Sequence, residues 1–415
     1  MEFKEAKEYI DGLSKYGSKL GLDNIKALLA LLDNPEEKLN VIHVAGTNGK
    51  GSTIAFMGNI LKKAGYKVGK YTSPVVFEYL EKYQINDKNI DEEAFVSLVS
   101  KVKKALEQMK EQDIQPTIFE VETAMAFEYF KNEKCDVVIL ETGMGGDMDA
   151  TNVCHKVLAS VLVSISLDHT GFLGDTIEEI AEHKAGIIKD GCPVVVMRQQ
   201  ENVMKVIREK ALKCNSPVYL ANSVDKKTGL AGKWQKNNAG VAVKVMEVLA
   251  NEHSFKINDE HIDKGLADVK WPGRFERILD NPCIIIDGAH NPDAAIRLRE
   301  TIDAEYKDTI FVYIIGVLGD KDFDEVIKTM ADRGEYIITI TPPNARGLEA
   351  DILMEAVVKY NKKVQAAESI EKAYDIAINK LEDISGNKGI LAFGSLSYLG
   401  EFKRICKEKG NDNRK

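Results

Sequence analysis

Apolar runs of strand length alternate with helical patterns along most of the chain, and this alternation most strongly constrains the fold. In the first part the strand-like runs are IHVAG, CDVVILETG, VLASVLVSIS and PVVVM, and helical patterns such as IEEIAEHKAGII lie between them. Strands joined by helical crossovers pair in parallel and are covered by helices. The sequence therefore predicts an α/β fold with a parallel-rich sheet.

A second series of strand-like runs follows the segment WPGR. It reads CIIIDGAH, TIFVYIIGV, EYIITIT and GILAFGS, with a helix expected from Asp293. A chain of 415 residues also exceeds what one hydrophobic core usually supports. We therefore place a domain boundary between Arg277 and Asn281 and expect two domains, residues 1–278 and a smaller, doubly wound α/β domain of residues 279–415.

The charge balance argues against a general role in binding nucleic acids or membrane surfaces. The formal net charge is −9, and the basic residues are scattered along the chain. The six cysteines include no CxxC pair, which suits reduced thiols in a cytoplasm. The N-terminus MEFKEAKEYI is charged from its second residue, and no apolar stretch has the length of a membrane span. We therefore expect a cytoplasmic protein without a signal peptide or anchor.

The stretch VIHVAGTNGKGST turns abruptly from an apolar strand into glycine and small polar residues. Gly46, Gly49 and Gly51 lack a Cβ, so the backbone can curl tightly and point successive N–H groups into one concave nest. The following run TIAFMGNILKKAGY has a helical pattern, and its N-terminus would face the same point. This arrangement is typical of an anion-binding loop.

Two side chains of this stretch indicate that the bound anion is a triphosphate. Lys50 adds a compact positive charge, and Ser52 offers a hydroxyl suited to Mg²⁺. The stretch departs from the standard Walker pattern, because Val44 occupies the position of its first glycine and Gly51 separates Lys50 from Ser52. An ordinary glycine-rich turn between a strand and a helix is the alternative interpretation.

Polar residues follow the other predicted strands, at the sheet edge where ligands of open α/β proteins gather. Glu120, in TIFEVETAMAFEYF, could bind Mg²⁺ directly, although Glu120 and Glu122 could equally be acids of a first helical turn. Asp168 and Thr176 could be N-caps, and the capping-box sequence TIEE favours that role for Thr176. His169 could be a satisfied loop residue or a metal ligand, and both alternatives stay open.

Taken together, these segments resemble the folylpolyglutamate synthase and dihydrofolate synthase family of the Mur ligase superfamily. The shared segments follow the family's order and span nearly the whole chain: LDNPEEKLNVIHVAGTNGKGS, YTSP, FEVETAMAF, ETGMGGDMDATN, LDHTGFLGDTIEEIAEHKAGIIK, WPGRFE, DGAHNP and GSLSYLGE. The resemblance implies an N-terminal P-loop ATPase domain of the Mur ligase type and a smaller C-terminal domain, with ATP between them.

The resemblance also implies roles for individual residues. Ser73, Glu120 and His169 match the family's Mg²⁺ ligands, and Lys184 matches a lysine that the family carbamylates to bind a second Mg²⁺. Otherwise Lys184 would be a solvated helix lysine. Lys50, Lys184 and His169 are the residues expected to act in catalysis. The residues expected at the nucleotide are Gly46, Thr47, Asn48, Gly49, Lys50, Gly51, Ser52, Thr53, Asn238, Arg274, Asp287 and, near the phosphates, His290.

The reaction implied by the resemblance is an ATP-dependent amide synthesis in two steps. A carboxylate of dihydropteroate or of a tetrahydrofolate attacks the γ-phosphorus of ATP, and the amine of L-glutamate then displaces phosphate from the acyl phosphate. Phosphoryl transfer needs positioning and charge neutralisation, which Lys50 and two Mg²⁺ ions would supply without a protein nucleophile. The family also leads us to expect a monomer.

The chain departs from the family pattern at two positions. Val75 stands where the family commonly has a histidine after Ser-Pro, and Asp147 stands where it commonly has the arginine of Gly-Gly-Arg. Both segments are expected near the pterin or the substrate carboxylate. They motivate a second hypothesis, a ligase for another carboxylate. A nucleotide-binding regulatory or scaffolding protein is a third, which the intact Lys50, Glu120, His169 and Lys184 argue against.

Overall fold

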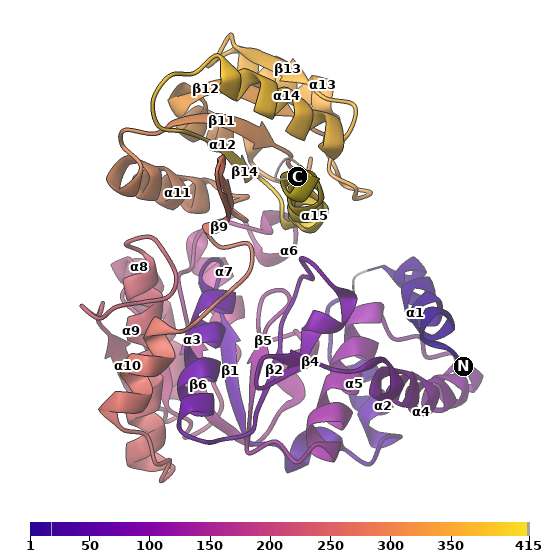
Figure 1. Cartoon of the computed structure of the whole chain (residues 1–415). Coiled ribbons are helices and arrows are strands. Elements are labelled where there is room, and N and C mark those ends of the chain that lie inside the picture. The colour runs from indigo at the N-terminus through magenta and orange to yellow at the C-terminus, as the bar shows by residue number, and fades with distance from the viewer. Residues whose placement is uncertain (18, 413–415) are drawn as a thin grey trace. The chain divides into compact units, whose positions relative to one another are not determined.

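The chain folds into two compact units in a computed structural model that describes residues 1–17 and 19–412 (Figure 1). The first unit comprises Met1–Pro74, Leu80–Gly229 and Lys236–Val269. The second comprises Val75–Tyr79, Leu230–Gln235 and the described residues from Lys270 onward. Two short segments embedded in the first part of the sequence thus belong to the second unit. The predicted domain division after residue 278 stays a prediction.

The first unit is built on a sheet that has eight strands within the described residues, in the order β4-β3-β2-β5-β1-β6-β7-β8. The six strands from β2 to β8 in this order pair in parallel, whereas β3 pairs antiparallel with β2 and β4. The predicted parallel-rich sheet is confirmed. The strands are β1 (Val41–Ala45), β2 (Val68–Tyr71), β3 (Tyr83–Ile85), β4 (Lys88–Asn89), β5 (Val137–Glu141), β6 (Val157–Leu162), β7 (Val194–Met197) and β8 (Val218–Ala221).

Helices pack around this sheet, with α10 against α3 and the helices α2, α4 and α5 against one another (Figure 1). They are α1 (Phe3–Asp11), α2 (Asp23–Ala30), α3 (Lys50–Lys63), α4 (Glu92–Glu111), α5 (Ile118–Asn132), α6 (Thr170–Leu173), α7 (Ile177–Ala185), α8 (Glu201–Lys213), α9 (Gln235–Glu252) and α10 (Asp259–Ala267). Short 3₁₀ helices cover Gly12–Tyr16, Pro35–Lys38, Tyr79–Lys82 and Ala150–Val153, and Ala331–Arg333 in the second unit.

The second unit contains a sheet with the strand order β13-β12-β11-β14-β10-β9 in the described residues, parallel except for β9. Its strands are β9 (Glu276–Asp280), β10 (Cys283–Ile286), β11 (Ile310–Ile315), β12 (Gly334–Thr339), β13 (Val364–Ala366) and β14 (Lys388–Phe393). Its helices are α11 (Pro292–Glu305), α12 (Phe323–Met330), α13 (Ala350–Val358), α14 (Ile370–Glu382) and α15 (Leu396–Asp412). The helix expected from Asp293 therefore begins one residue earlier.

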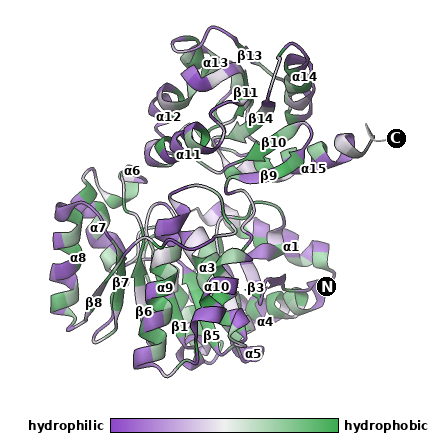
Figure 2. Ribbon diagram, turned by 60° about the vertical axis from the view of Figure 1, so that its left-hand side comes forward, coloured by the Kyte–Doolittle hydropathy of each residue, from purple (hydrophilic) through white to green (hydrophobic). Residues whose placement is uncertain are grey.

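Burial follows the strand period of two in the second unit. In β11, Phe311 and Tyr313 face one hydrophobic core, while Val312 and Ile314 face another on the opposite side of the sheet. The central strands of both sheets are accordingly coloured as hydrophobic in Figure 2. A sheet buried on both faces is the doubly wound arrangement predicted from the sequence.

Among the helices of the described residues, none combines the length and the apolar character that crossing a membrane requires.

Candidate active site

The glycine-rich loop joins the end of β1 to the start of α3. Gly46 and Gly49 have φ angles of +153° and +92°, a region that favours glycine. A Cβ would lie 2.3 Å from Val163 Cγ2 at Gly46 and 2.5 Å from Asn238 Oδ1 at Gly49. Both close approaches exclude any side chain. The loop therefore keeps the tight curve that a phosphate-binding nest needs.

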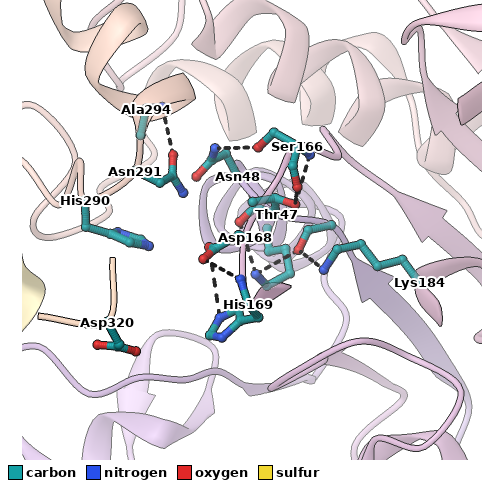
Figure 3. A network of polar contacts seen from close by, with 12 residues as sticks. Thr47, Asn48, Ser166, Asp168, His169, Lys184, His290, Asn291, Ala294 and Asp320 are labelled. Atoms are coloured by element: carbon teal, nitrogen blue, oxygen red, sulfur yellow. Dashed lines mark hydrogen bonds and ion pairs between the residues drawn. The ribbon is translucent and has the colours of Figure 1, made fainter. Parts of the chain in front are cut away.

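The loop is also tied to the segment that follows β6. The backbone N–H groups of Thr47 and Asn48 donate to the Ser164 carbonyl oxygen at 2.6 and 3.3 Å. Thr47 Oγ1 donates to the Ser166 carbonyl oxygen at 3.0 Å and accepts from its N–H at 3.1 Å, and Asn48 Nδ2 donates to Ser166 Oγ at 3.5 Å (Figure 3). The glycine-rich loop and the loop that carries His169 are thus held together.

Lys50 folds back over the loop at the N-terminus of α3. Its Nζ donates to the carbonyl oxygens of Gly46 at 3.1 Å and Thr47 at 3.4 Å, and lies 3.8 Å from Glu141 Oε1. Only 17% of the side chain is exposed. Gly51, Ser52 and Thr53 are buried within the first turn of α3. A positive side chain and a helix N-terminus therefore face the same loop, which suits an anion.

Lys184 reaches the same loop from α7. Its side chain is 4% exposed, and its Nζ donates to the Gly46 carbonyl oxygen at 3.1 Å (Figure 3). A lysine on a helix surface would extend into water, so the alternative of a solvated helix lysine is not what the structure shows. Thr176 caps this helix in a capping box with Glu179, as TIEE predicts.

The three other predicted metal ligands occupy different local settings. Glu120 lies in the first turn of α5, where its Oε2 accepts from Thr117 N at 2.7 Å and Thr117 Oγ1 at 2.9 Å in a capping box. Ser73 donates its backbone N–H to Glu141 Oε2 at 3.2 Å. Within residues 1–17 and 19–412, no group of three or more His, Cys, Asp or Glu side chains is placed to hold a metal ion.

His169 lies in the loop between β6 and α6. Its φ of +53° is in the left-handed region, it occupies the N-cap position of α6, and its side chain is 34% exposed. Asp168 Oδ1 accepts from the His169 N–H at 2.9 Å, and Asp168 Oδ2 lies 4.0 Å from His169 Nε2. The Asp168 carboxylate thus lies beside the imidazole of a partly exposed loop residue (Figure 3).

The predicted nucleotide residues are divided between the two units. Asn238, on α9, belongs to the first unit and lies beside Gly49. Arg274, Asp287 and His290 belong to the second unit, where Arg274 Nη1 lies 2.7 Å from the position of a Cβ added at Gly288. Asp287 accepts from the N–H groups of Phe275 at 2.7 Å and Ala289 at 2.8 Å.

The pKa of the Asp287 carboxyl is raised above its ordinary value. Burial raises this pKa by more than the positive charge of Arg274 and the two backbone hydrogen bonds lower it. His290 Nδ1 lies 2.8 Å from the Gly288 carbonyl oxygen, so Nδ1 carries the proton and donates.

The chain matches the models of two protein families in succession. Residues 44–260 match the Mur ligase middle domain, and residues 273–396 match the Mur ligase, glutamate ligase domain. The chain is also 35% identical over 433 residues to the dihydrofolate synthase/folylpolyglutamate synthase of Bacillus subtilis, with 98% of this chain and 99% of that protein covered. The chain belongs to the folylpolyglutamate synthase/dihydrofolate synthase family of the Mur ligase superfamily. The predicted family and the predicted class of ATP-dependent acid–amino-acid ligase are confirmed.

Other members of this family are similar over most of the chain. The folylpolyglutamate synthase of Lacticaseibacillus casei is 36% identical over 360 residues, covering 80% of this chain and 83% of its own. The structure of Mycobacterium tuberculosis folylpolyglutamate synthase complexed with ADP and AMPPCP superposes with a TM-score of 0.91 at 27% identity, covering 97% and 99% of the two chains. The structure of E. coli FolC in complex with DHPP and ADP superposes with a TM-score of 0.84 at 28% identity, covering 99% of this chain and 98% of that chain.

The two departures from the family pattern lie in different units. Asp147 belongs to the first unit, where its carboxylate faces the imidazole of His183. Val75 belongs to the second unit, in the segment Val75–Tyr79, whose Val76 lies against Gly400 and whose Phe77 lies under Lys403 of α15. Asp147 is therefore engaged in a local hydrogen bond, and Val75 directly precedes two residues that contact α15.

Glu141 is a site residue that our sequence analysis did not single out. It ends β5, is 6% exposed, and lies between the Ser73 N–H and Lys50 Nζ. Its place as the acid after the apolar run CDVVIL is the signal that could have revealed it, because polar strand-end residues line the functional edge of such sheets.

The sequence also did not reveal a buried network of hydrogen bonds that begins at His43 of β1. His43 Nε2 donates to Thr151 Oγ1 at 2.8 Å, and Thr151 Oγ1 donates to Asp149 Oδ1. Asp149 Oδ2 in turn accepts from Met144 N at 2.8 Å. Burial lowers the pKa of His43 to about 3 and raises that of Asp149. A histidine inside an apolar strand gives little sign of such a network.

Proposed function

We propose that this chain uses ATP to add L-glutamate to a folate-type carboxylate, converting dihydropteroate to dihydrofolate, extending tetrahydrofolates to polyglutamates, or both. One observation carries the proposal. Lys50 and Lys184, 134 positions apart in the sequence, both donate to the carbonyl oxygen of Gly46, a position where an added Cβ would lie 2.3 Å from Val163. The Bacillus subtilis relative named for both activities, and E. coli FolC in complex with DHPP and ADP, support the substrate class.

The residues of the loop suit the triphosphate of ATP. The N–H groups at the start of α3, the helix dipole and the Lys50 ammonium would neutralise charge that develops on the transferred phosphoryl group. The substrate carboxylate attacks the γ-phosphorus and ADP leaves. The glutamate amine then attacks the acyl carbon of the acyl phosphate, forms the amide bond and releases phosphate and a proton. In this scheme the protein binds and orients the substrates and excludes water from them.

Asn238, Arg274, Asp287 and His290 are proposed to complete the nucleotide site. Asn238 lies directly behind Gly49, so its side chain supports the curve of the phosphate loop from α9. Asp287 is proposed to bind the ribose, which offers hydroxyl donors to a carboxylate.

Magnesium is proposed to be held by Ser73, Glu120 and His169, and a second ion by carbamylated Lys184. When bound, the ions would neutralise the phosphate oxygens. Glu120 fits this role, since its Oε2 accepts both capping hydrogen bonds from Thr117 and its Oε1 takes part in neither of them. The hydroxyl of Ser73 and an imidazole beside Asp168 add oxygen and nitrogen donors, whereas an uncharged or protonated Lys184 cannot ligate a cation through an oxygen.

Carbamylation would supply that oxygen. The neutral Nζ amine attacks the carbon of CO₂, forming an N–C bond and releasing one proton, and the product is a carboxylate-ended side chain. Lys184→Ala should therefore weaken turnover, with partial rescue by acetate or added bicarbonate. An alanine variant with unchanged turnover would rule out this role. Lys205→Ala is a suitable control, because Lys205 is an exposed lysine of α8 whose Nζ lies 4.0 Å from Glu209 Oε1.

The decisive experiment measures phosphate release from Mg-ATP with L-glutamate present and dihydropteroate or tetrahydrofolate offered separately, with products identified by mass. A glutamyl product from dihydropteroate establishes dihydrofolate synthase activity, and one from tetrahydrofolate establishes chain extension. ATP binding without release in either mixture would contradict the proposal. It would favour a ligase for another carboxylate, which the presence of Val75 and Asp147 motivates.

We further propose that the protein acts as a monomer in the cytoplasm and does not bind nucleic acid. The scattered charge and the net charge of −9 support the last point. A sedimentation measurement that gave a stable dimer would contradict the first.

A further inference from the structure

Asp147 and His183 form a hydrogen-bonded contact next to Lys184. His183 Nδ1 lies 2.9 Å from Asp147 Oδ1 and 3.1 Å from Oδ2. A carboxylate only accepts hydrogen bonds when ionised, so Nδ1 carries the proton and donates. The Asp147 side chain comes from the loop after β5 and is 40% exposed, and the His183 side chain comes from the last turn of α7 and is 35% exposed.

The backbones of the two segments are in close contact at the same place. The Asp147 N–H donates to the His183 carbonyl oxygen at 2.9 Å. A Cβ on Gly146 would lie 2.6 Å from the His183 carbonyl oxygen and 2.9 Å from that of Lys184, and a Cβ on Gly186 would lie 2.3 Å from Asp147 Cβ. These approaches leave no space for the loop to shift toward the helix.

A third contact holds the helix end from the other side of the loop. Asn152 Nδ2 donates to the carbonyl oxygens of Asp147 at 3.0 Å and Gly186 at 3.2 Å. The loop therefore clasps the end of α7 on both sides of Lys184, through His183 and Gly186. Such a clasp resists both rotation and translation of the last helical turn.

Neighbouring residues of a helix point about 100° apart. On α7, His183 faces the loop after β5, whereas Lys184 extends to the Gly46 carbonyl oxygen of the phosphate loop. Any rotation that broke the His183 contact would also swing Lys184 away from Gly46. The direction of the Lys184 side chain is thus linked to the Asp147 contact by helix geometry.

We infer that Asp147 and His183 are positioning residues that direct Lys184 toward the phosphate loop, an inference that depends on the proposed role of Lys184. An arginine at position 147 would set its own donors against the N–H of His183 and remove the acceptor. The Asp147 carboxylate is therefore matched within the protein by His183, and its presence does not imply a different carboxylate substrate.

The test compares four variants by kcat and KM in glutamate-dependent phosphate release: Asp147→Ala, Asp147→Asn, Asp147→Arg, and Asp147→Arg combined with His183→Glu. Asp147→Ala should lower kcat about tenfold and leave the KM for the carboxylate substrate within about twofold, because the misplaced group acts after binding. Asp147→Asn keeps an acceptor oxygen and should stay within about threefold of the unchanged protein. If Asp147→Ala loses kcat while Asp147→Asn stays active, the result supports the role of Asp147 as a positioning residue.

The reciprocal pair separates positioning from substrate contact. Asp147→Arg alone should lose activity, and adding His183→Glu should restore kcat to within about threefold, since the pair then has a donor and an acceptor in reversed order. A rise in the KM for the carboxylate substrate, or no recovery in the double variant, would overturn the inference and assign Asp147 to the substrate. Asp263→Ala removes an exposed ion pair to Lys226 and serves as the matched control.

A readout without turnover keeps this inference separate from the proposed function. Crystal structures of the unchanged protein and of Asp147→Ala give the distance from Lys184 Nζ to the Gly46 carbonyl oxygen. Displacement of Nζ in the variant supports positioning even if no folate substrate is turned over. An unmoved Lys184 would overturn the inference whatever the activity of the enzyme.

Discussion

Lys184 donates a hydrogen bond to the Gly46 carbonyl oxygen at 3.1 Å, across 138 positions of sequence. Lys50 donates to the same oxygen at the same distance. Two side-chain nitrogens from distant parts of the sequence therefore converge on one carbonyl oxygen of the glycine-rich loop. Glu141, 3.8 Å from Lys50, offsets part of the positive charge of that lysine.

Replacing Lys50 with alanine should abolish phosphate release and leave the fold intact. The side chain contacts loop carbonyls and a carboxylate, and contributes charge at the loop without filling the core. A loss of kcat of about 10³-fold or more is expected, measured by phosphate release with far-UV circular dichroism on the same samples. Lys62→Ala, near the other end of α3 and paired with exposed Asp87, is the control. Full activity in Lys50→Ala would refute the phosphate-loop assignment.

Replacing Gly49 with alanine should weaken ATP binding at least about tenfold. Its φ is +92°, and the new Cβ would lie 2.5 Å from Asn238 Oδ1, so the loop must shift where it is proposed to meet the phosphates. Isothermal titration with AMPPCP measures the change. Gly12→Ala is the control, because Gly12 has a φ of −62° and no atom within 4 Å of a new Cβ. Equal affinities in the two variants would contradict this role of Gly49.

Acid should destabilise the first unit through His43. Burial lowers the pKa of His43 from 6.5 to about 3, so the unfolded chain binds a proton that the folded chain does not. The free energy of unfolding should therefore fall by about 1.4 kcal/mol per pH unit as the pH drops from about 6.5 toward about 3, from this group alone. Urea unfolding followed between pH 7 and 5 would measure the slope.

His43→Gln should remove that part of the pH dependence, while the exposed His155→Gln should retain it. Identical slopes for all three proteins would show that His43 binds a proton equally well in the folded chain.

Trp234 and Arg297 should stabilise the second unit. The Arg297 Cζ lies 3.4 Å from the centre of the Trp234 ring, and the guanidinium also pairs with Asp293 at 2.7 Å. Arg297 is only 14% exposed, so this cation–π contact is partly shielded from water. Arg297→Met should lower the free energy of unfolding of this unit by about 2 kcal/mol.

Intrinsic tryptophan fluorescence reports on this unit, because both tryptophans of the chain, Trp234 and Trp271, belong to it. Arg404→Met, which removes an exposed ion pair with Glu408, should cost about 0.5 kcal/mol or less. A cost for Arg297→Met no larger than that of Arg404→Met would rule out a stabilising stack.

The local features of this protein could be predicted from its sequence. The alternation of apolar runs and helical patterns indicated parallel sheets, and the TIEE sequence indicated the capping box at Thr176. The glycines indicated a tight loop between β1 and α3. Each of these signals depends on residues within about one turn or strand of one another.

The contacts between distant segments were decided only by the tertiary structure. Nothing in the local sequence pairs Asp147 with His183, Glu141 with Ser73, or His43 with Thr151. These pairs form because the sheet order brings β1 between β5 and β6, so loops far apart in the chain meet at one edge. Periodicity encodes which face of an element is buried, whereas the partner on that face depends on how whole elements pack.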